Sequence, residues 1–197
     1  MRAVLTLVLL SLTSADAPAG EGRPVAEPAE HVFRASAGVE LKAYVFSSPL
    51  QKGSELRPGI VVFHGGGWAM GEPAWAFSRA RHFAELGMVA VAAQYRLSDQ
   101  KSITPVEAMS DARAAIRWMR SEARSLGVDP KRIAAYGWSA GAHLAAAAAI
   151  FDDAPAAQLS AAPNALILVS PAVSVASDPW FQRLLGDRGH ARDFSPD

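Results

Sequence analysis

Four runs of continuous apolar residues most constrain how this chain can fold. They are rich in β-branched and aromatic residues and lie at 60–65, 88–95, 132–137 and 165–170. Apolar runs without alternation are typical of strands that are covered on both faces of a sheet. Because segments of helical length separate the runs, we expect parallel crossovers. The predicted fold class is an open α/β sheet, mostly parallel, with helices on both faces.

The segments between the runs carry helix signals. Residues 74–86 predict a helix that ends at Gly87, and residues 140–151 predict an alanine-rich helix. Thr104-Pro105-Val106-Glu107 forms a capping box with proline at the first helical position. The apolar residues that follow recur at alternating spacings of three and four, which predicts one buried helix face that stops at Gly127. These residues are Met109, Ala112, Ile116, Met119, Ala123 and Leu126.

The N-terminus has the features of a secretory signal peptide. Arg2 precedes an apolar stretch of about ten residues, and Ala15-Asp16-Ala17 resembles a signal-peptidase site. A membrane span needs about 20 apolar residues, so we expect cleavage near Ala17 and a secreted or periplasmic protein. The alternative is a buried N-terminal strand or helix.

The predicted domain organisation follows from this N-terminus. Residues 1–17 form the signal peptide, and residues 18–30, rich in Pro, Gly and Glu, form a flexible lead-in. Residues 31–197 form one α/β domain, which we expect to be incomplete at its C-terminus. It opens with a hairpin, because 31–35 and 39–46 alternate apolar and polar residues around a glycine.

Composition excludes several classes of protein. The 19 basic and 19 acidic residues give a formal net charge of zero, whereas nucleic-acid binders carry a basic excess. The chain has no cysteine, which excludes a disulfide framework, a thiolate metal site and a cysteine nucleophile. No His, Asp or Glu cluster has metal-ligand spacing, so we expect no metal and no cofactor.

The first chemical motif is GWSAG, from Gly137 to Gly141, between an apolar run and the alanine-rich helix. A serine on a sharp strand-to-helix turn is the nucleophile elbow of serine hydrolases. The residues two before and two after Ser139 must be small, because the strand and helix backbones approach closely there. The alternative is that Ser139 only caps an ordinary helix.

The second motif is HGGGW, beginning at His64 where the first apolar run ends. Three successive glycines let backbone amides turn toward an oxyanion, which an acyl-transfer site must bind. Gly65, Gly66 and Gly67 are predicted to supply one or two of these donors, and the Ala140 amide another. The alternative is a glycine-rich turn without a ligand.

Together these motifs resemble the HGGG type of α/β-hydrolase esterases and lipases, including acetyl- and feruloyl-esterase-like and hormone-sensitive-lipase-like enzymes. The resemblance covers about 31–197 and implies a serine carboxylic-ester hydrolase with Ser139 as nucleophile. Further segments follow the family's order: QYRL at 94–97, the helix that contains Asp111 to Trp118, VDPKRIAAYGWSAGAHLA at 128–145, and the strand that ends in Ser170-Pro171. Prolyl-oligopeptidase-like peptidases share the elbow, but the glycine triplet favours esters.

The expected substrate is a small-molecule or carbohydrate-linked ester. No long insertion precedes the first apolar run, so we expect no sizeable cap domain and a shallow site for short acyl groups. Neither nucleic acid nor a stable membrane span is expected, and the sequence leaves the oligomeric state open.

One departure from the family is serious. A serine nucleophile requires a general base, and the base requires an orienting carboxylate. In this fold both follow the serine, carboxylate first and histidine last. Only one convincing strand follows Ser139, so the resemblance places both groups beyond Asp197 and predicts a fragment that lacks the last strands.

Two alternatives to a fragment stay open. Asp178 or Asp187 with His190 could form a compressed triad, or the chain is a naturally shortened, non-catalytic binding or scaffold protein. Because the acid and base are missing, we predict that this polypeptide turns over p-nitrophenyl acetate very weakly.

Other residues have simpler interpretations. His64 is expected to brace the glycine turn, and His143 to pack or hydrogen-bond within the fold. His82 is expected near the surface, Asp111 in a structural hydrogen bond or in solvent, and Asp152-Asp153 in a solvated turn. Trp68, Trp75 and Phe77 are candidates for an acyl or alcohol pocket, or for plain core.

Overall fold

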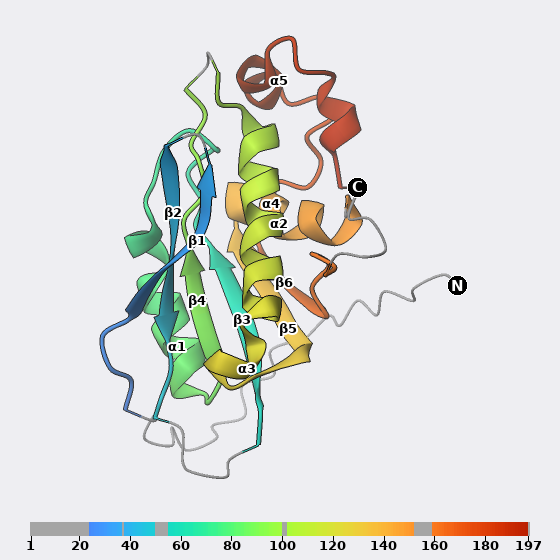
Figure 1. The fold of residues 1–197 in the computed structure, drawn as a ribbon. Coiled ribbons are helices and arrows are strands. Elements are labelled where there is room, and N and C mark those ends of the chain that lie inside the picture. The colour runs from blue at the N-terminus through green and yellow to red at the C-terminus, as the bar shows by residue number, and fades with distance from the viewer. Residues whose placement is uncertain (1–23, 37, 50–54, 100–101, 152–158, 197) are drawn as a thin grey trace.

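The computed structural model describes residues 24–36, 38–49, 55–99, 102–151 and 159–196. They form one six-stranded sheet in the order β1-β2-β4-β3-β5-β6 (Figure 1). β4, β3, β5 and β6 run parallel, whereas β1 and β2 are antiparallel. The predicted, mostly parallel α/β sheet is therefore confirmed. The strands are β1 (Ala29–Ser36), β2 (Val39–Phe46), β3 (Arg57–Phe63), β4 (Val89–Ala93), β5 (Val128–Trp138) and β6 (Ala165–Val169).

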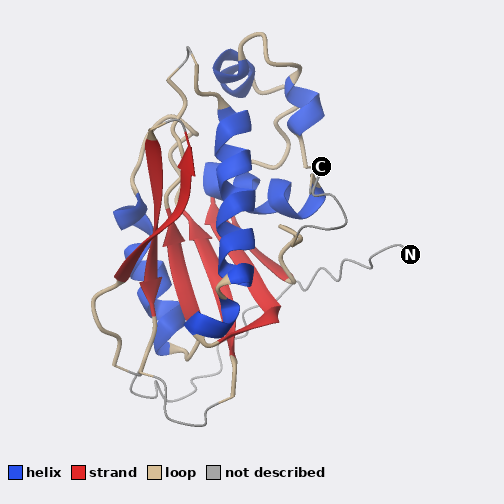
Figure 2. Cartoon of the chain, viewed as in Figure 1, coloured by secondary structure: helices blue, strands red, loops and turns tan. Residues whose placement is uncertain are grey.

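Helices cover both faces of this sheet (Figure 2). Successive side chains of a strand point to opposite faces. In β3, Ile60 and Val62 pack toward α1, and Val61 and Phe63 belong to the core that includes α2 and α4. This two-sided burial explains the unbroken apolar runs. The helices are η1 (Pro73–Ala76), α1 (Phe77–Glu85), α2 (Pro105–Ser121), α3 (Ala123–Leu126), α4 (Ala140–Ile150), α5 (Pro179–Leu185) and η2 (Ala191–Phe194).

The capping box at the start of α2 forms as predicted. The Thr104 hydroxyl accepts a hydrogen bond from the Val106 amide at 3.2 Å, and the Glu107 carboxylate accepts one from the Thr104 amide at 2.8 Å. Gly127 ends the helical region with φ at 68°, in the left-handed region. The helix is nevertheless interrupted at Glu122, so α3 is a separate turn.

Several other element predictions need correction. The segment 74–86 begins as the short 3-10 helix η1 before it becomes α1, and Pro73, which has no amide hydrogen, starts it. β5 begins at Val128, because Val128 pairs with Arg57 of β3. β6 is not a buried strand. Its residues alternate between exposed and half-buried, since it lies at an edge of the sheet.

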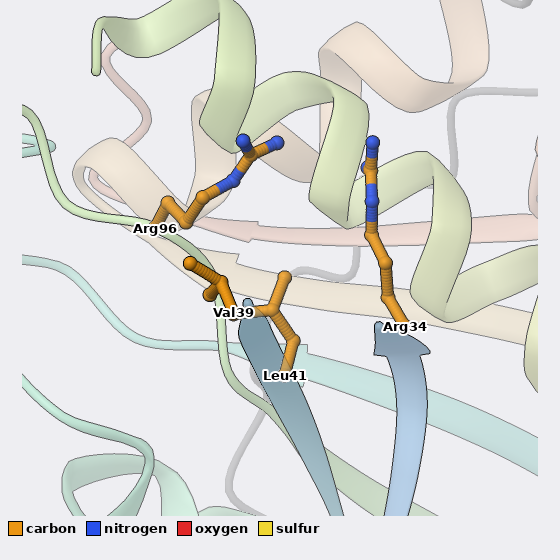
Figure 3. A pocket seen from close by; sticks show the side chains of 4 residues that line it. All are labelled: Arg34, Val39, Leu41 and Arg96. Atoms are coloured by element: carbon orange, nitrogen blue, oxygen red, sulfur yellow. The ribbon is translucent and has the colours of Figure 1, made fainter. Parts of the chain in front are cut away.

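Asp111 of α2 is fully buried, which settles its two interpretations in favour of structural hydrogen bonds. Its carboxylate accepts from the guanidinium groups of Arg34 and Arg96, with three N–O distances of 2.8 Å. Arg34 comes from β1 and Arg96 from the loop after β4, and both reach toward α2 beside Val39 and Leu41 (Figure 3). One carboxylate thus ties an edge strand and a loop to a core helix.

The predicted signal peptide lies outside the described residues, and so do residues 18–23 of the lead-in and Asp152-Asp153. The hairpin forms as predicted, although β1 already begins at Ala29. Near the end of the lead-in, the Arg81 guanidinium donates to the Val25 carbonyl at 2.9 Å. Among the helices of the described residues, none is long and apolar enough to cross a membrane.

Candidate active site

Ser139 lies at the junction of β5 and α4, in a conformation that L-residues rarely adopt. Its φ is 52° and its ψ is −122°, and the residue is exposed to solvent. The Ser139 amide donates to the Val169 carbonyl at the end of β6, at 3.0 Å. Such a strained backbone persists only where its surroundings enforce it, and it is characteristic of functional sites.

Gly137 and Gly141 are the small residues that this turn requires. A Cβ on Gly137 would overlap with the backbone of Gly141, and a Cβ on Gly141 would overlap with the carbonyls of Phe63 and His64. Helix α4 therefore begins in direct contact with the end of β3. Because β3 and β5 are adjacent parallel strands, with Phe63 opposite Gly137, the two sequence motifs meet at the same edge of the sheet.

The glycine loop, defined here as residues 64–70, follows β3 directly. Gly66, Gly67 and Trp68 all have positive φ angles, of 129°, 57° and 61°. The Gly66 carbonyl accepts from the amides of Ala69 and Met70, and a Cβ on Gly66 would overlap with the Met70 carbonyl. Gly65 lies against the Trp138 indole, where a Cβ would come within 2.7 Å of Nε1.

The backbone amides of Gly66, Gly67 and Ala140, at this edge of the sheet, are the candidate donors to a ligand. In the part of the chain that the structure describes, no backbone hydrogen bond outside the helices and strands is donated by the amides of Gly66 or Gly67. Ala140 is the first residue of α4, and first-turn amides of a helix have no partner within it. Two motifs that are far apart in the sequence thus meet at one edge of the sheet, where Ser139 is exposed.

His64 braces the glycine loop. Its Nδ1 lies 2.6 Å from the Gly65 carbonyl, and the Tyr95 hydroxyl donates to the His64 carbonyl at 2.9 Å. The Tyr95 and His64 rings stack at 4.4 Å. Burial lowers the pKa of His64, which the Gly65 carbonyl partly opposes. This histidine is a neutral, buried support.

His143, on α4, is also held within the fold, as the sequence predicts. Its Nδ1 accepts from the Trp68 indole at 3.3 Å, and its Nε2 donates to the Phe194 carbonyl at 2.9 Å. Both ring nitrogens are therefore engaged. Burial lowers the pKa of His143 to about 4.

Asp178, one of the two acids of the compressed triad alternative, has another role in the structure. The Asp178 carboxylate caps α5 by accepting from the amides of Trp180 and Phe181, at 2.8 and 3.2 Å. At the start of η2, the His190 backbone amide donates to the Asp193 carboxylate at 3.3 Å. Within the described residues, no histidine or carboxylate side chain forms a hydrogen bond with the Ser139 hydroxyl. The same part of the chain contains no group of three or more acidic or histidine residues placed to hold a metal ion.

The aromatic candidates divide between core and surface. Trp68 is 3% exposed and contacts Phe181 with ring centroids 4.9 Å apart, so it belongs to the core. Phe77 packs against Tyr44 and Phe46. Trp75 is about half exposed, with its ring 6.0 Å from that of His64, so it stays a candidate for substrate contact.

Sequence reasoning missed one residue at the site. Trp180 of α5 donates from its indole Nε1 to the Gly67 carbonyl at 3.0 Å. No local pattern around Trp180 signals this contact, because it joins residues that only the folded chain brings together. Its neighbour Asp178 predicts a helix start but not where the helix packs.

A parallel α/β sheet that presents a strained serine turn and a glycine loop at adjacent strand ends is the architecture of α/β hydrolases. Residues 60–188 match a family model described as alpha/beta hydrolase fold, and the chain belongs to this family.

A deacetylase and a carboxylesterase are among the curated proteins similar to this chain. Arylacetamide deacetylase of Oryctolagus cuniculus is 35% identical over 116 residues, which make up 56% of this chain and 28% of that protein. Carboxylesterase NlhH of Mycobacterium tuberculosis is 38% identical over 91 residues, 45% of this chain and 28% of that protein. The chain thus spans under a third of the length of either relative.

Among solved structures, a thermophilic esterase from the Planctomycetes species Thermogutta terrifontis superposes with a TM-score of 0.76. It is 35% identical, and the match covers 86% of this chain and 65% of that one. The same esterase has been solved phosphorylated by paraoxon and with propionate or butyrate bound.

Proposed function

We propose that Ser139 is the nucleophile of a carboxylic ester hydrolase that works through an acyl-enzyme. The observation that supports this most directly is the exposed Ser139 in its strained turn, beside the amides of the glycine loop. Family membership and the esterase relatives point to the same chemistry.

In the proposed reaction, the Ser139 Oγ attacks the ester carbonyl while a general base takes the hydroxyl proton. The amides of Ala140 and of the Gly65–Gly67 region would hold the carbonyl oxygen as it becomes negatively charged. The proton then passes to the departing alkoxide, which leaves as an alcohol. Water, activated by the same base, hydrolyses the acyl-enzyme and releases the acid.

The base is the part of this proposal that the described residues do not supply. His64 and His143 are engaged in the fold, and among the described residues no hydrogen bond joins the His190 ring to Ser139. The resemblance to HGGG-type esterases implies an acid and a histidine that follow Asp197.

The proposed substrates are esters with short acyl groups, including carbohydrate-linked acetyl esters. The similar Thermogutta terrifontis esterase has been solved with propionate or butyrate bound, which supports short acyl groups. A prolyl-oligopeptidase-like peptidase is the less favoured candidate, because three glycines follow His64 and the relatives are esterases.

The test is covalent modification of Ser139. Paraoxon should add one diethylphosphoryl group and release p-nitrophenol, as seen by intact-protein mass. The addition should be slow, because the described residues supply no base for the Ser139 proton, and Ser139→Ala should abolish it. Hydrolysis of p-nitrophenyl acetate should stay weak, since an oxyanion hole without acid and base leaves on the order of 10³–10⁴-fold acceleration over water.

Two outcomes would change this assignment. Turnover on the order of 1–10³ s⁻¹, abolished by Ser139→Ala, would contradict the weak-turnover prediction and make His190 the leading candidate for the base. No phosphorylation of Ser139 at any paraoxon concentration would favour the non-catalytic binding or scaffold protein.

We also propose that the protein is secreted or periplasmic. The support is the apolar N-terminal segment and the cleavage-site pattern at Ala15–Ala17. N-terminal sequencing of protein recovered from a secreting host should begin near Pro18. An intact Met1 in the exported fraction would contradict cleavage.

A further inference from the structure

His143 is a buried histidine that the ester hydrolysis proposed above does not use. It is fully buried on α4, one helical turn after Ser139, and its amide donates to the Ser139 carbonyl at 3.2 Å. Its ring contacts the glycine loop on one side, through Trp68, and η2 on the other, through Phe194. This one imidazole joins the helix of the nucleophile to the loop that offers the amides.

We propose that His143 is a positioning residue whose neutral imidazole, through its hydrogen bond with Trp68, holds the glycine loop in the conformation that presents its amides beside Ser139. The inference rests on the proposed esterase function for its meaning. The contact on which it depends can be tested without any catalysis.

The two hydrogen bonds determine where the ring proton is. An indole N–H can only donate, so Nδ1 must be unprotonated to accept from Trp68. The Phe194 carbonyl can only accept, so Nε2 carries the hydrogen. Protonation of Nδ1 would place two donors face to face and break the Trp68 contact. The surroundings favour the neutral form, because the rings of Trp68 and Phe181 lie 5.2 Å from that of His143 and burial lowers its pKa.

Trp68 is the residue through which this contact acts on the loop. It adopts a φ of 61°, a strained conformation for a bulky side chain, directly after Gly67. Its indole is held by His143 and its ring by Phe181, and its carbonyl accepts from the Ser98 amide at 2.8 Å. If the indole contact is lost, Trp68 can relax toward negative φ. The amides of the glycine loop would then turn away from the serine.

Two substitutions of His143 distinguish the effect of its hydrogen bond with Trp68 from that of its hydrogen bond with Phe194. His143→Asn places an amide oxygen near the position of Nδ1, where it can still accept from Trp68, but loses the bond to Phe194. His143→Phe keeps a ring and loses both bonds. His82→Asn is the matched control, because the His82 side chain on α1 is 59% exposed.

The first measurement is the rate of Ser139 phosphorylation by paraoxon, at a temperature where melting curves show every variant folded. His143→Phe should react at least about ten-fold more slowly than the wild type, because losing one oxyanion donor lowers the reaction rate on the order of 10²–10³-fold. His143→Asn and His82→Asn should stay near the wild-type rate. The double variant His143→Phe/Trp68→Phe should react no more slowly than the slower single variant. Equal slowing in His143→Asn and His143→Phe, or wild-type reactivity in His143→Phe, would overturn the inference.

The second measurement separates this inference from the proposed function. In ¹⁵N NMR spectra, Trp68→Phe identifies the Trp68 indole resonance. Its N–H proton should exchange slowly with solvent in the wild type and in His143→Asn, and much faster in His143→Phe. If paraoxon does not phosphorylate Ser139 but this exchange pattern is observed, the esterase proposal is contradicted and the positioning contact is supported. If the Trp68 indole proton exchanges in His143→Phe as slowly as in the wild type, the positioning role is contradicted even if Ser139 reacts with paraoxon.

Discussion

Because Gly141 has no Cβ, the backbone of α4 can lie directly against the end of β3, where the site forms. Helix α4 begins where a Cβ on Gly141 would overlap with two carbonyls at the end of β3. In an ordinary helix, alanine would be favoured over glycine by about 1 kcal/mol. At this position the overlap reverses the preference, since the backbones must separate to admit a methyl group.

We expect Gly141→Ala to lower the free energy of unfolding by roughly 1–3 kcal/mol, and to slow the reaction of Ser139 with paraoxon. Urea denaturation and intact-protein mass measure the two effects. Gly38→Ala is the control, because Gly38 has a φ of 79° and no atom within 4 Å of an added Cβ. It should cost stability without slowing Ser139. A Gly141→Ala variant as stable and reactive as the wild type would contradict the close approach.

His143 predicts a pH dependence of stability. Its pKa falls from an ordinary 6.5 to about 4 on folding, because burial disfavours the charged ring. Between pH 6.5 and pH 4 the unfolded chain binds a proton that the folded chain does not, so stability falls as the pH falls through this window. The free energy of unfolding should drop by about 2 kcal/mol between pH 7 and pH 5 from this group.

Urea denaturation at the two pH values tests the size of this drop. In His143→Asn, which cannot titrate in this range, the drop should be smaller by a similar amount. An identical drop in the variant and the wild type would assign the pH dependence to other groups, of which His64 is the first candidate because burial also lowers its pKa.

At the scale of elements, the buried carboxylate of Asp111 joins α2 to β1 and to the loop after β4. Breaking a buried ion pair from one side leaves charges without partners in a low-dielectric interior. Asp111→Ala would remove the shared partner of two arginines whose side chains are 29% and 23% exposed, so we expect a loss of stability somewhat below the roughly 3–5 kcal/mol of a fully buried pair.

Asp129→Ala is the comparison for this prediction, because Asp129 pairs with Arg132 on the surface at 2.8 Å. An exposed pair of this kind contributes about 0–1 kcal/mol. Thermal or urea denaturation of both variants measures the contrast. Equal losses of stability would mean that the Asp111 network adds no more than a surface pair.

The elements themselves were largely predictable, because their signals are local. The start of α2 follows from four consecutive residues, and Gly127 ends the helical region through its own backbone conformation. The strands were recognisable because burial on both faces removes the alternation of polar residues. The predictions were wrong where a tertiary contact determines the bounds or the burial of an element. Pairing with Arg57 extends β5 to Val128, and the position of β6 at the sheet edge leaves half of that strand exposed.

At the scale of the whole molecule, β6 lies at one edge of the sheet that the described residues form, and it has an apolar surface. Among the described strands it pairs only with β5, and Ile167 and Val169 are each more than 40% exposed. Edge strands with exposed apolar side chains promote association between chains, and lysine on such a strand opposes it.

We therefore expect Ile167→Lys to reduce concentration-dependent association, measured by static light scattering. Leu86→Lys is the control, because Leu86 is 66% exposed at the end of α1, away from this edge. A wild-type protein that shows no association over the same concentrations would contradict the prediction, as would equal effects of the two lysines.

The sequence alone determined the fold class and the proposed nucleophile, because both depend on patterns within short segments. The apolar runs predict covered parallel strands, and GWSAG between a strand and a helix places Ser139 on a tight turn. The order of the strands, the meeting of the two motifs and the partners of His143 and Trp180 were decided only by tertiary structure. Each of these depends on contacts between residues that lie far apart in the chain. No local propensity carries that information, since the free energy of such a contact exists only once both segments are in place.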